Sequence, residues 1–121
     1  MIKNPYPGKF IAFEGPDGSG QSTQVEKLAK YLTALHKKDP KNFPPVHVTK
    51  EPSTSFIGGL IREALRERWK HGPKYGALLM QAFFVADRAH HLEHEVIPAL
   101  EKGHAVITDR YLFSTIAYGA A

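Results

Sequence analysis

The chain has 121 residues and no cysteine, which excludes disulfides and thiolate-bound zinc and allows one domain, residues 1–121. Its net charge of +4, from 16 basic and 12 acidic residues spread along the sequence, is explained by small anionic ligands as well as by nucleic acid, and we expect no nucleic-acid partner. No apolar run reaches membrane-spanning length and the first residues lack a signal-peptide core, so we expect a cytoplasmic protein with no membrane partner.

The first structural signature is a strand followed by a helix. Residues 10–13 form a short apolar run that is typical of a buried strand. Val25, Leu28, Ala29 and Leu32 then recur at the i, i+3, i+4, i+7 spacing of an amphipathic helix. The glycine-rich segment between these elements therefore joins a strand to a helix.

This segment reads GPDGSGQS over residues 15–22, which matches the phosphate-binding pattern GxxxxGK followed by Ser or Thr, except that Gln21 replaces the lysine. The glycines let backbone N–H groups turn toward an anion, and the helix N-terminus adds further donors. The alternative is a glycine turn that only connects the two elements. We expect phosphate contacts from Gly15, Pro16, Asp17, Gly18, Ser19, Gly20, Gln21, Ser22 and Thr23, with the Ser22 hydroxyl on Mg²⁺.

The remaining sequence repeats the strand–helix alternation. A charged, proline-broken connection over residues 36–45 precedes a second strand at 46–49. A helix is predicted for residues 56–69, with an apolar face, and a long helix is predicted from Pro73 to about Leu100, bent before Pro98 and stopped by Gly103. A third strand at 105–108 precedes another helix from about Ser114. Three β-α units predict a parallel sheet between helices, with functional groups at the carboxyl ends of the strands.

Three histidines follow the middle of the long predicted helix. His90 and His94 have the i, i+4 spacing of a metal-binding pair, and His91 lies between them. No third ligand beyond Glu93 is indicated. A solvated helical face is therefore the preferred interpretation, and a zinc site is the alternative.

Four clusters at the predicted strand ends and helix faces make the chain resemble the thymidylate kinase family. They are residues 13–20, 49–52, 84–88 and 109–111, the last followed by residues 114–118. The resemblance implies a three-layer α/β/α fold of the P-loop NTPase type, with ATP as phosphoryl donor, Mg²⁺ as cofactor and dTMP as acceptor. In the family, two further strands, a lid and an adenine-contacting loop follow the counterpart of Ala121, so the resemblance implies a domain that is incomplete after the third strand.

The resemblance also implies a homodimer, formed by helices equivalent to those predicted at residues 56–69 and from Pro73. The apolar Ile57, Leu60 and Ile61 could contribute to such an interface, or they could face the chain's own sheet. A non-catalytic nucleotide-binding module and a related P-loop deoxynucleoside kinase are the alternative functions.

For dTMP, the resemblance implies a site built from several elements. Phe84 and Arg88 share a helix face, so the ring would stack on thymine while the guanidinium binds the base edge. Read without the resemblance, Phe84 is core and Arg88 is a solvated charge. Asp17 would accept a hydrogen bond from the sugar hydroxyl or from water, or it would cap its own turn. The implied dTMP ligands are Asp17, Lys50, Phe84, Arg88, Arg110, Ser114 and Tyr118.

Two of these ligands differ in how closely they follow the family pattern. Lys50 stands where the family usually has an arginine that grips the acceptor phosphate, and Glu51 beside it would support the metal and water network. Otherwise both residues are loop charges. Tyr118 matches the aromatic residue under the deoxyribose, or it packs as an ordinary amphipathic side chain.

Phosphoryl transfer would use the segment that follows the third strand. Asp109 would hold Mg²⁺ together with Ser22, and Arg110 would neutralise phosphoryl oxygens. The alternatives are a surface ion pair or a helix cap. Gln21 carries no charge, whereas the lysine of the pattern is a positive donor to the transferring phosphoryl group. Loss of one such donor typically lowers the rate by about 10²–10³. The implied catalytic residues are Asp17, Gln21 and Arg110.

Overall fold

The computed structural model describes residues 3–67, 72 and 74–112. Within these residues, no helix combines the length and the apolar character that crossing a membrane requires. The described elements, in chain order, are β1 (Lys9–Phe13), α1 (Gln21–Lys38), β2 (Val46–Lys50), α2 (Phe56–Leu65), α3 (Gly76–His91), the π-helical η1 (Leu92–Val96), α4 (Ile97–Glu101) and β3 (Ala105–Asp109).

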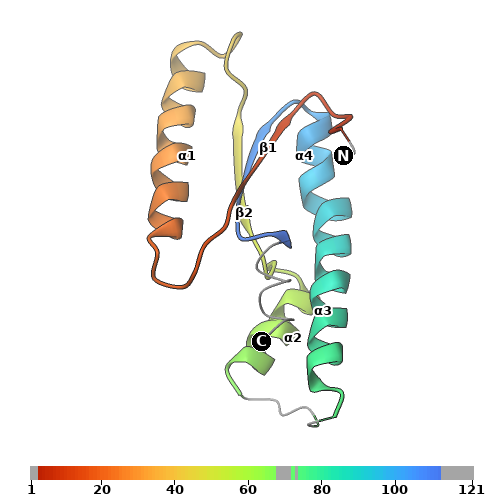
Figure 1. Ribbon diagram of the computed structural model, residues 1–121. Coiled ribbons are helices and arrows are strands. Elements are labelled where there is room, and N and C mark those ends of the chain that lie inside the picture. The colour runs from red at the N-terminus through yellow and green to blue at the C-terminus, as the bar shows by residue number, and fades with distance from the viewer. Residues whose placement is uncertain (1–2, 68–71, 73, 113–121) are drawn as a thin grey trace.

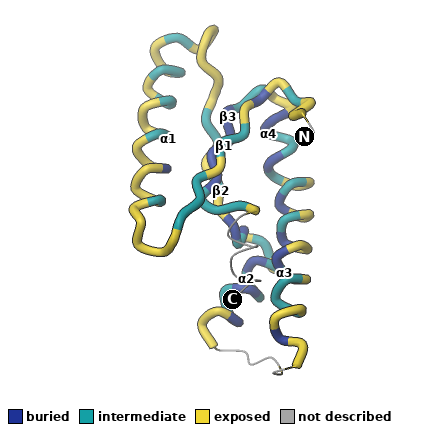
Figure 2. The backbone as a smooth tube through the Cα atoms, in the orientation of Figure 1, coloured by how far each residue is buried: buried dark blue, intermediate teal, exposed yellow. Residues whose placement is uncertain are grey.

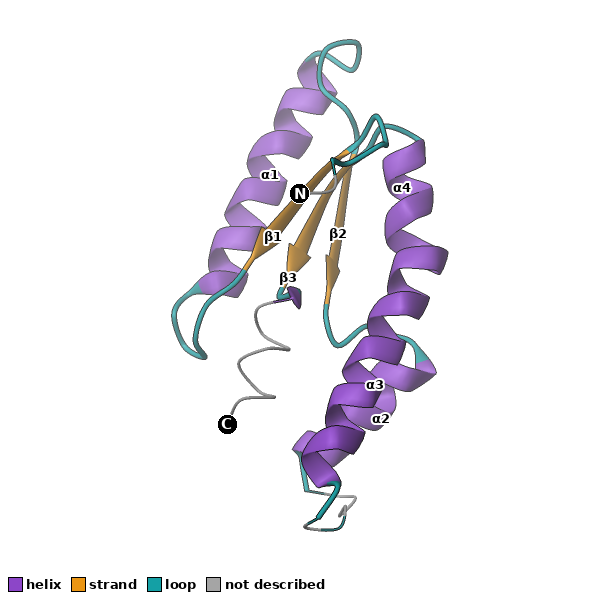
Figure 3. Cartoon of the chain, turned by 45° about the vertical axis from the view of Figure 1, so that its right-hand side comes forward, coloured by secondary structure: helices purple, strands orange, loops and turns teal. Residues whose placement is uncertain are grey.

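The strands form a three-stranded parallel sheet in the order β1-β3-β2, which confirms the predicted α/β class. The register pairs Phe13 and Lys50 with Asp109 on the central strand, so the carboxyl ends of all three strands lie at one edge. Helix α1 lies on one face of the sheet, and the rod of α3, η1 and α4 extends along the other (Figure 1). The view in Figure 3 shows the strands between α1 and α4. Loops that leave the same sheet edge are therefore brought together.

The core lies between the sheet and the C-terminal part of this rod. Val96, Ala99, Leu100 and Val106 form one buried cluster, with Tyr6, Phe10 and Leu92 packed around it. Strand β3 is buried along its length except at Asp109. By contrast, Val25 is the residue of α1 that is fully buried, and most of that helix is exposed (Figure 2).

Helix α2 is shorter than predicted, because it ends at Leu65 rather than near Trp69. The chain leaves the helical conformation there, and Glu67 has a left-handed φ of 58°. The start of α2 is tightly packed, since a Cβ on Gly58 would lie 2.0 Å from the carbonyl oxygen of Ser53. Ile61 is fully buried within the chain, which favours the alternative that it packs internally over a place in a dimer interface.

The long helix predicted up to Leu100 is interrupted by a π-helical turn. The N–H of Ile97 donates to the carbonyl of Leu92, five residues earlier, just before Pro98. The predicted start at Pro73 lies outside the described residues, and α3 itself begins at Gly76. Gly103 follows α4 with a φ of 82° and ends the helix as predicted.

Candidate functional site

The phosphate-type loop connects β1 to α1 at the carboxyl edge of the sheet. The N–H of Ser19 donates to the carbonyl of Pro16 at 3.2 Å, which closes the turn. Gly20 precedes α1 with a φ of 83°, a conformation that other residues rarely adopt. A cavity of about 310 Å³ lies over the loop. It is lined by Pro16, Gly18, Ser19, Gly20, Gln21, Ser22, Thr23 and Arg110.

The three consecutive residues from Asp109 to Tyr111 each contact this loop. One oxygen of Asp109 accepts from the hydroxyl of Ser22 at 2.6 Å, and the other accepts from the amide of Gln21. Arg110 forms an ion pair with Asp17. The backbone N–H of Tyr111 donates to the carboxylate of Glu14 at 2.7 Å. The loop and the end of β3 therefore form one hydrogen-bonded unit.

The backbone of Arg110 is held in the left-handed region, with a φ of 71°. Its N–H donates to the carbonyl of Phe13 at 2.9 Å, and its carbonyl accepts from the hydroxyl of Thr108 at 2.9 Å. A non-glycine residue in this region costs on the order of 1–3 kcal/mol and persists because its surroundings fix it. The fixed backbone directs the guanidinium toward the cavity over the loop.

The side chain of Gln21 is partly buried and points toward Asp109 at the end of β3. Its amide nitrogen donates to Asp109, while its side-chain oxygen is buried and has no hydrogen-bond partner among the described residues. A Cβ on Gly15 would lie 3.2 Å from that oxygen and 2.8 Å from the hydroxyl of Ser19, so the glycine allows close packing here. Because Gln21 stands where the pattern has a lysine, this position brings no positive charge to the loop.

Ser22 and Asp109 present oxygen atoms of the kind that Mg²⁺ prefers. The Ser22 hydroxyl lies 2.6 Å from one carboxylate oxygen of Asp109, so the two side chains approach one point. Both residues and Lys50 also line a cavity of about 300 Å³ beside the loop. The donor set fits a divalent cation, and Lys50 lies at the edge of the same space.

On the other side of the sheet edge, Arg88 of α3 is held between two partners. Its Nε and Nη2 atoms donate to one oxygen of Glu51 at 3.1 and 2.6 Å, and Nη2 also donates to the carbonyl of Tyr111 at 2.9 Å. The guanidinium lies 4.6 Å from the centre of the Tyr111 ring. Burial raises the pKa of the Tyr111 phenol above its usual value, against the opposing charge of Arg88.

Glu51 has a different environment from the one expected. Its side chain is 5% exposed and binds Arg88 and His91, so the alternative that Glu51 is a loop charge is wrong, while its support of a metal and water network stays a prediction. Phe84, one turn before Arg88, is 7% exposed. The site therefore contains a buried ion pair below the predicted base-recognition face.

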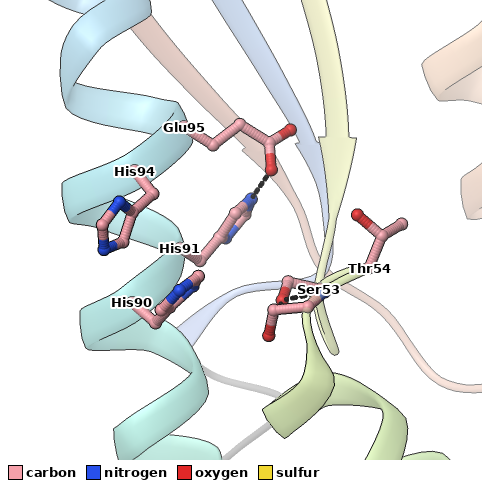
Figure 4. A pocket seen from close by; sticks show the side chains of 7 residues that line it. Ser53, Thr54, His90, His91, His94 and Glu95 are labelled. Carbon is pink, nitrogen blue, oxygen red and sulfur yellow. Dashed lines mark hydrogen bonds and ion pairs between the residues drawn. The ribbon is translucent and has the colours of Figure 1, made fainter.

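The solvated-face interpretation holds for His90 and His94, whose rings stack at 4.3 Å between centroids. It is wrong for His91, which is buried. The three rings line a cavity of about 270 Å³ with Glu95 and residues 53–55 (Figure 4). Across residues 3–67, 72 and 74–112, no three His, Cys, Asp or Glu side chains gather as metal ligands would.

Several contacts at the site were not predicted from the sequence. Asp87, beside Arg88, accepts from the N–H and the hydroxyl of Ser53 at 2.7 and 2.6 Å and from the hydroxyl of Ser55 at 3.0 Å. The site contacts of Glu14 and His91 were missed. The sequence signal that could have indicated these residues was a charged or polar side chain at a strand end or within an apolar helical pattern. Ser114 and Tyr118, two of the predicted dTMP ligands, lie outside the described residues.

Comparison with known proteins gives a consistent result. A family model described as thymidylate kinase matches residues 13–121. The thymidylate kinase of Bifidobacterium longum subsp. infantis is 44% identical over 118 residues, which cover 93% of this chain and 46% of that protein. That of Carboxydothermus hydrogenoformans is 43% identical over 112 residues, which cover 92% of this chain and 50% of that protein. The crystal structure of thymidylate kinase from Ehrlichia chaffeensis matches with a TM-score of 0.74 and 34% identity, over 93% of this chain and 56% of that one. The chain thus spans about half the length of these curated relatives.

Proposed function

This chain belongs to the thymidylate kinase family, and we propose on that premise that the natural protein transfers the γ-phosphoryl group of ATP to dTMP. An oxygen of the dTMP phosphate attacks the γ-phosphorus, the bond to the β–γ bridging oxygen breaks, and ADP and dTDP leave. The observation that carries the proposal is the contact of Asp109, Arg110 and Tyr111 with the phosphate loop, while Tyr111 also accepts from Arg88. A phosphate-binding segment and a base-binding candidate therefore lie on one connected unit.

The donor phosphates would lie over the loop from Gly15 to Thr23. Backbone N–H groups at the start of α1 and the guanidinium of Arg110 would bind their oxygens, since both border the same cavity. Ser22 and Asp109 would hold Mg²⁺. When bound, this ion neutralises charge on the transferring phosphoryl group. Because phosphoryl transfer needs positioning and charge neutralisation, these contacts account for the main catalytic requirements.

The acceptor would lie between the ends of β2, α3 and β3. Lys50, which lines the cavity with Asp109, would bind the phosphate of dTMP as a point charge. Arg88 would bind the base edge and Phe84 would lie against the base. Asp17, already paired with Arg110, would bind the sugar or its water. Ser114 and Tyr118 remain acceptor ligands that are predicted from the sequence alone.

Base recognition can be tested by calorimetry with dTMP, dCMP and dGMP. Arg88→Lys keeps a positive charge beside Glu51 but removes the planar fork. We expect tighter binding of dTMP than of the other two in the wild type, and a loss of about 1–3 kcal/mol of dTMP binding in Arg88→Lys. Arg66→Lys, at an exposed arginine, is the matched control. Equal affinity of the wild type for the three nucleotides would contradict the proposal.

We also propose a homodimer that packs through α3. Leu78, Ala82, Val85 and Ala89 follow an i, i+4, i+7, i+11 pattern and are exposed along one side of this helix. Val85 is 62% exposed, as is Tyr31 on the unrelated surface of α1. Light scattering should therefore show a dimer that Val85→Glu dissociates and that Tyr31→Glu leaves intact. A wild-type monomer at micromolar concentration would contradict this part of the proposal.

A further inference from the structure

We infer that His91 is a positioning residue for Arg88, acting through the carboxylate of Glu51, and that it thereby sets selectivity for the acceptor base. The inference rests on the proposed function, because it concerns the guanidinium assigned there to the base edge. It adds a residue that does not itself touch the acceptor.

The two oxygens of the Glu51 carboxylate have separate roles. Both donating nitrogens of Arg88 bond to the same oxygen, Oε2, at 3.1 and 2.6 Å. The other oxygen, Oε1, lies 3.2 Å from Nδ1 of His91. The terminal torsion of a glutamate is soft and broad, so contacts through Oε2 alone leave the carboxylate plane free to turn. The imidazole fixes that plane by holding the second oxygen.

The imidazole is itself fixed from its opposite side. Nε2 of His91 lies 2.6 Å from the hydroxyl of Thr49 on β2 and 3.4 Å from a carboxylate oxygen of Glu95. The other oxygen of Glu95 lies 2.9 Å from Nε2 of His47, also on β2. Rotation of the His91 ring would break contacts at both nitrogens. Strand β2 therefore determines the orientation of His91, and His91 determines that of Glu51.

The helix geometry supports this arrangement. Arg88 and His91 are three residues apart on α3, and Glu95 follows four residues later within the π-helical η1. These spacings bring the side chains to one side of the rod. Figure 4 shows His91 directed at Glu95 over the cavity beside Ser53 and Thr54. Single π turns inside α-helices are frequent at functional sites.

Burial makes the connection rigid. The side chains of His91, Glu51 and Arg88 are 1%, 5% and 12% exposed. Water therefore has little access to replace a lost partner, and a buried carboxylate left with one partner must shift toward another donor. A shift of Glu51 moves the guanidinium that is bonded to it. Base recognition depends on that guanidinium to within a few tenths of an ångström, since hydrogen bonds weaken steeply with poor geometry.

Two substitutions separate the two nitrogens of the ring. His91→Asn brings an amide close to the position of Nδ1 and retains a donor for Glu51, whereas His91→Gln reaches the position of Nε2 and loses that donor. Calorimetry should show a dTMP dissociation constant within about twofold of wild type for His91→Asn and about tenfold higher for His91→Gln. The ratio of dTMP to dCMP affinity should fall in His91→Gln. The matched control is His90→Asn, at the exposed neighbouring ring.

Urea unfolding of the same variants shows whether a lower dTMP affinity comes only from a loss of folded protein. If His91→Gln does not fold, Thr49→Val provides the milder test, because it replaces the hydroxyl beside Nε2 by a methyl group with little change in side-chain shape. It should raise the dTMP dissociation constant and leave the affinity for ATP unchanged. The KM for ATP in steady-state assays should likewise be unchanged in every folded variant.

The outcomes distinguish this inference from the proposed function. A wild type that prefers dTMP, with His91→Asn and His91→Gln equally selective, overturns the role of His91 and leaves the proposed function standing. For a His91→Gln variant that does not fold, unchanged dTMP affinity in Thr49→Val overturns it in the same way. A wild type with no preference for dTMP overturns the proposed function itself, together with the inference that rests on it.

Discussion

The side-chain amide of Gln21 donates a hydrogen bond to the carboxylate of Asp109, across the gap between the phosphate loop and the end of β3. The same carboxylate accepts from Ser22, so Asp109 is held by neutral donors on the loop side. A lysine at position 21 would instead bring a positive charge to this point. The loop is thus joined to the end of β3 by hydrogen bonds, while its charge is lower by one than the phosphate-binding pattern provides.

Gln21→Lys should therefore raise the rate of phosphoryl transfer. We expect kcat for dTMP phosphorylation to increase by about 10²-fold, with little change in dTMP affinity, because the added charge acts on the donor phosphates and the transferring group. A coupled ADP-release assay at saturating ATP and Mg²⁺ measures this.

Gln24→Lys is the control for this change, because it adds the same charge at an exposed position of α1. It should leave kcat near the wild-type value. A wild type that already turns over at an ordinary kinase rate, with no gain in Gln21→Lys, would show that Gln21 is not a handicap.

Removal of Glu51 should destabilise the protein strongly. Glu51→Ala leaves the buried guanidinium of Arg88 and the ring of His91 without their shared carboxylate, which typically costs about 3–5 kcal/mol of unfolding free energy. Urea unfolding measures the loss. Arg66→Ala breaks the exposed Arg66–Glu63 pair at 3.8 Å and should cost about 0–1 kcal/mol. A loss of similar size in both variants would contradict the buried-pair account.

Glu95 should contribute stability that disappears in acid. Partial burial by itself raises the pKa of this carboxyl group, but hydrogen bonds from Thr49 and His47 and the charges of His91 and His47 outweigh it and lower the pKa below its usual 4.5. A lowered folded-state pKa stabilises the protein above the unfolded-state pKa, and that stability is lost as the pH falls through the folded-state value. Glu95→Gln should therefore be less stable than wild type near neutral pH.

The difference in unfolding free energy between wild type and Glu95→Gln should narrow as the pH falls from about 6 to about 3. Urea unfolding at each pH measures this difference. Glu93→Gln, at an exposed carboxylate of the same turn, is the control. A difference in unfolding free energy that widens toward acid would contradict the lowered pKa of Glu95.

Local patterns were sufficient for much of the fold. The strands were predicted within one residue of their observed bounds, because short apolar runs between breaker residues are typical of buried parallel strands. The end of α2 was predicted too late, because apolar spacing does not report the left-handed φ of 58° at Glu67, where the chain has left the helix. The π turn before Pro98 was anticipated only as a bend. Periodicity does not report that the N–H of Ile97 bonds five residues back, to the carbonyl of Leu92.

The candidate site was predictable where it follows strand ends. The loop after β1 and the segment from Asp109 to Tyr111 are brought together by a parallel sheet, as such a sheet requires. The Glu51–Arg88 pair and the Glu51–His91 contact join residues 37 and 40 positions apart, and no local spacing indicates them. His91 was assigned to a solvated face because its exposed neighbours, His90 and His94, define a polar pattern.

The proposed dTMP kinase activity is tested by the formation of dTDP from ATP, Mg²⁺ and dTMP by the purified natural gene product. dCMP and dGMP serve as competing acceptors, and Asp109→Asn removes the charge proposed to hold Mg²⁺ while keeping an acceptor for Ser22. We expect dTDP above the protein-free control, formed faster than dCDP or dGDP, with a higher rate in Gln21→Lys and no dTDP in Asp109→Asn. Binding of dTMP without dTDP formation, in both wild type and Gln21→Lys, would contradict the proposed kinase activity and favour a nucleotide-binding module.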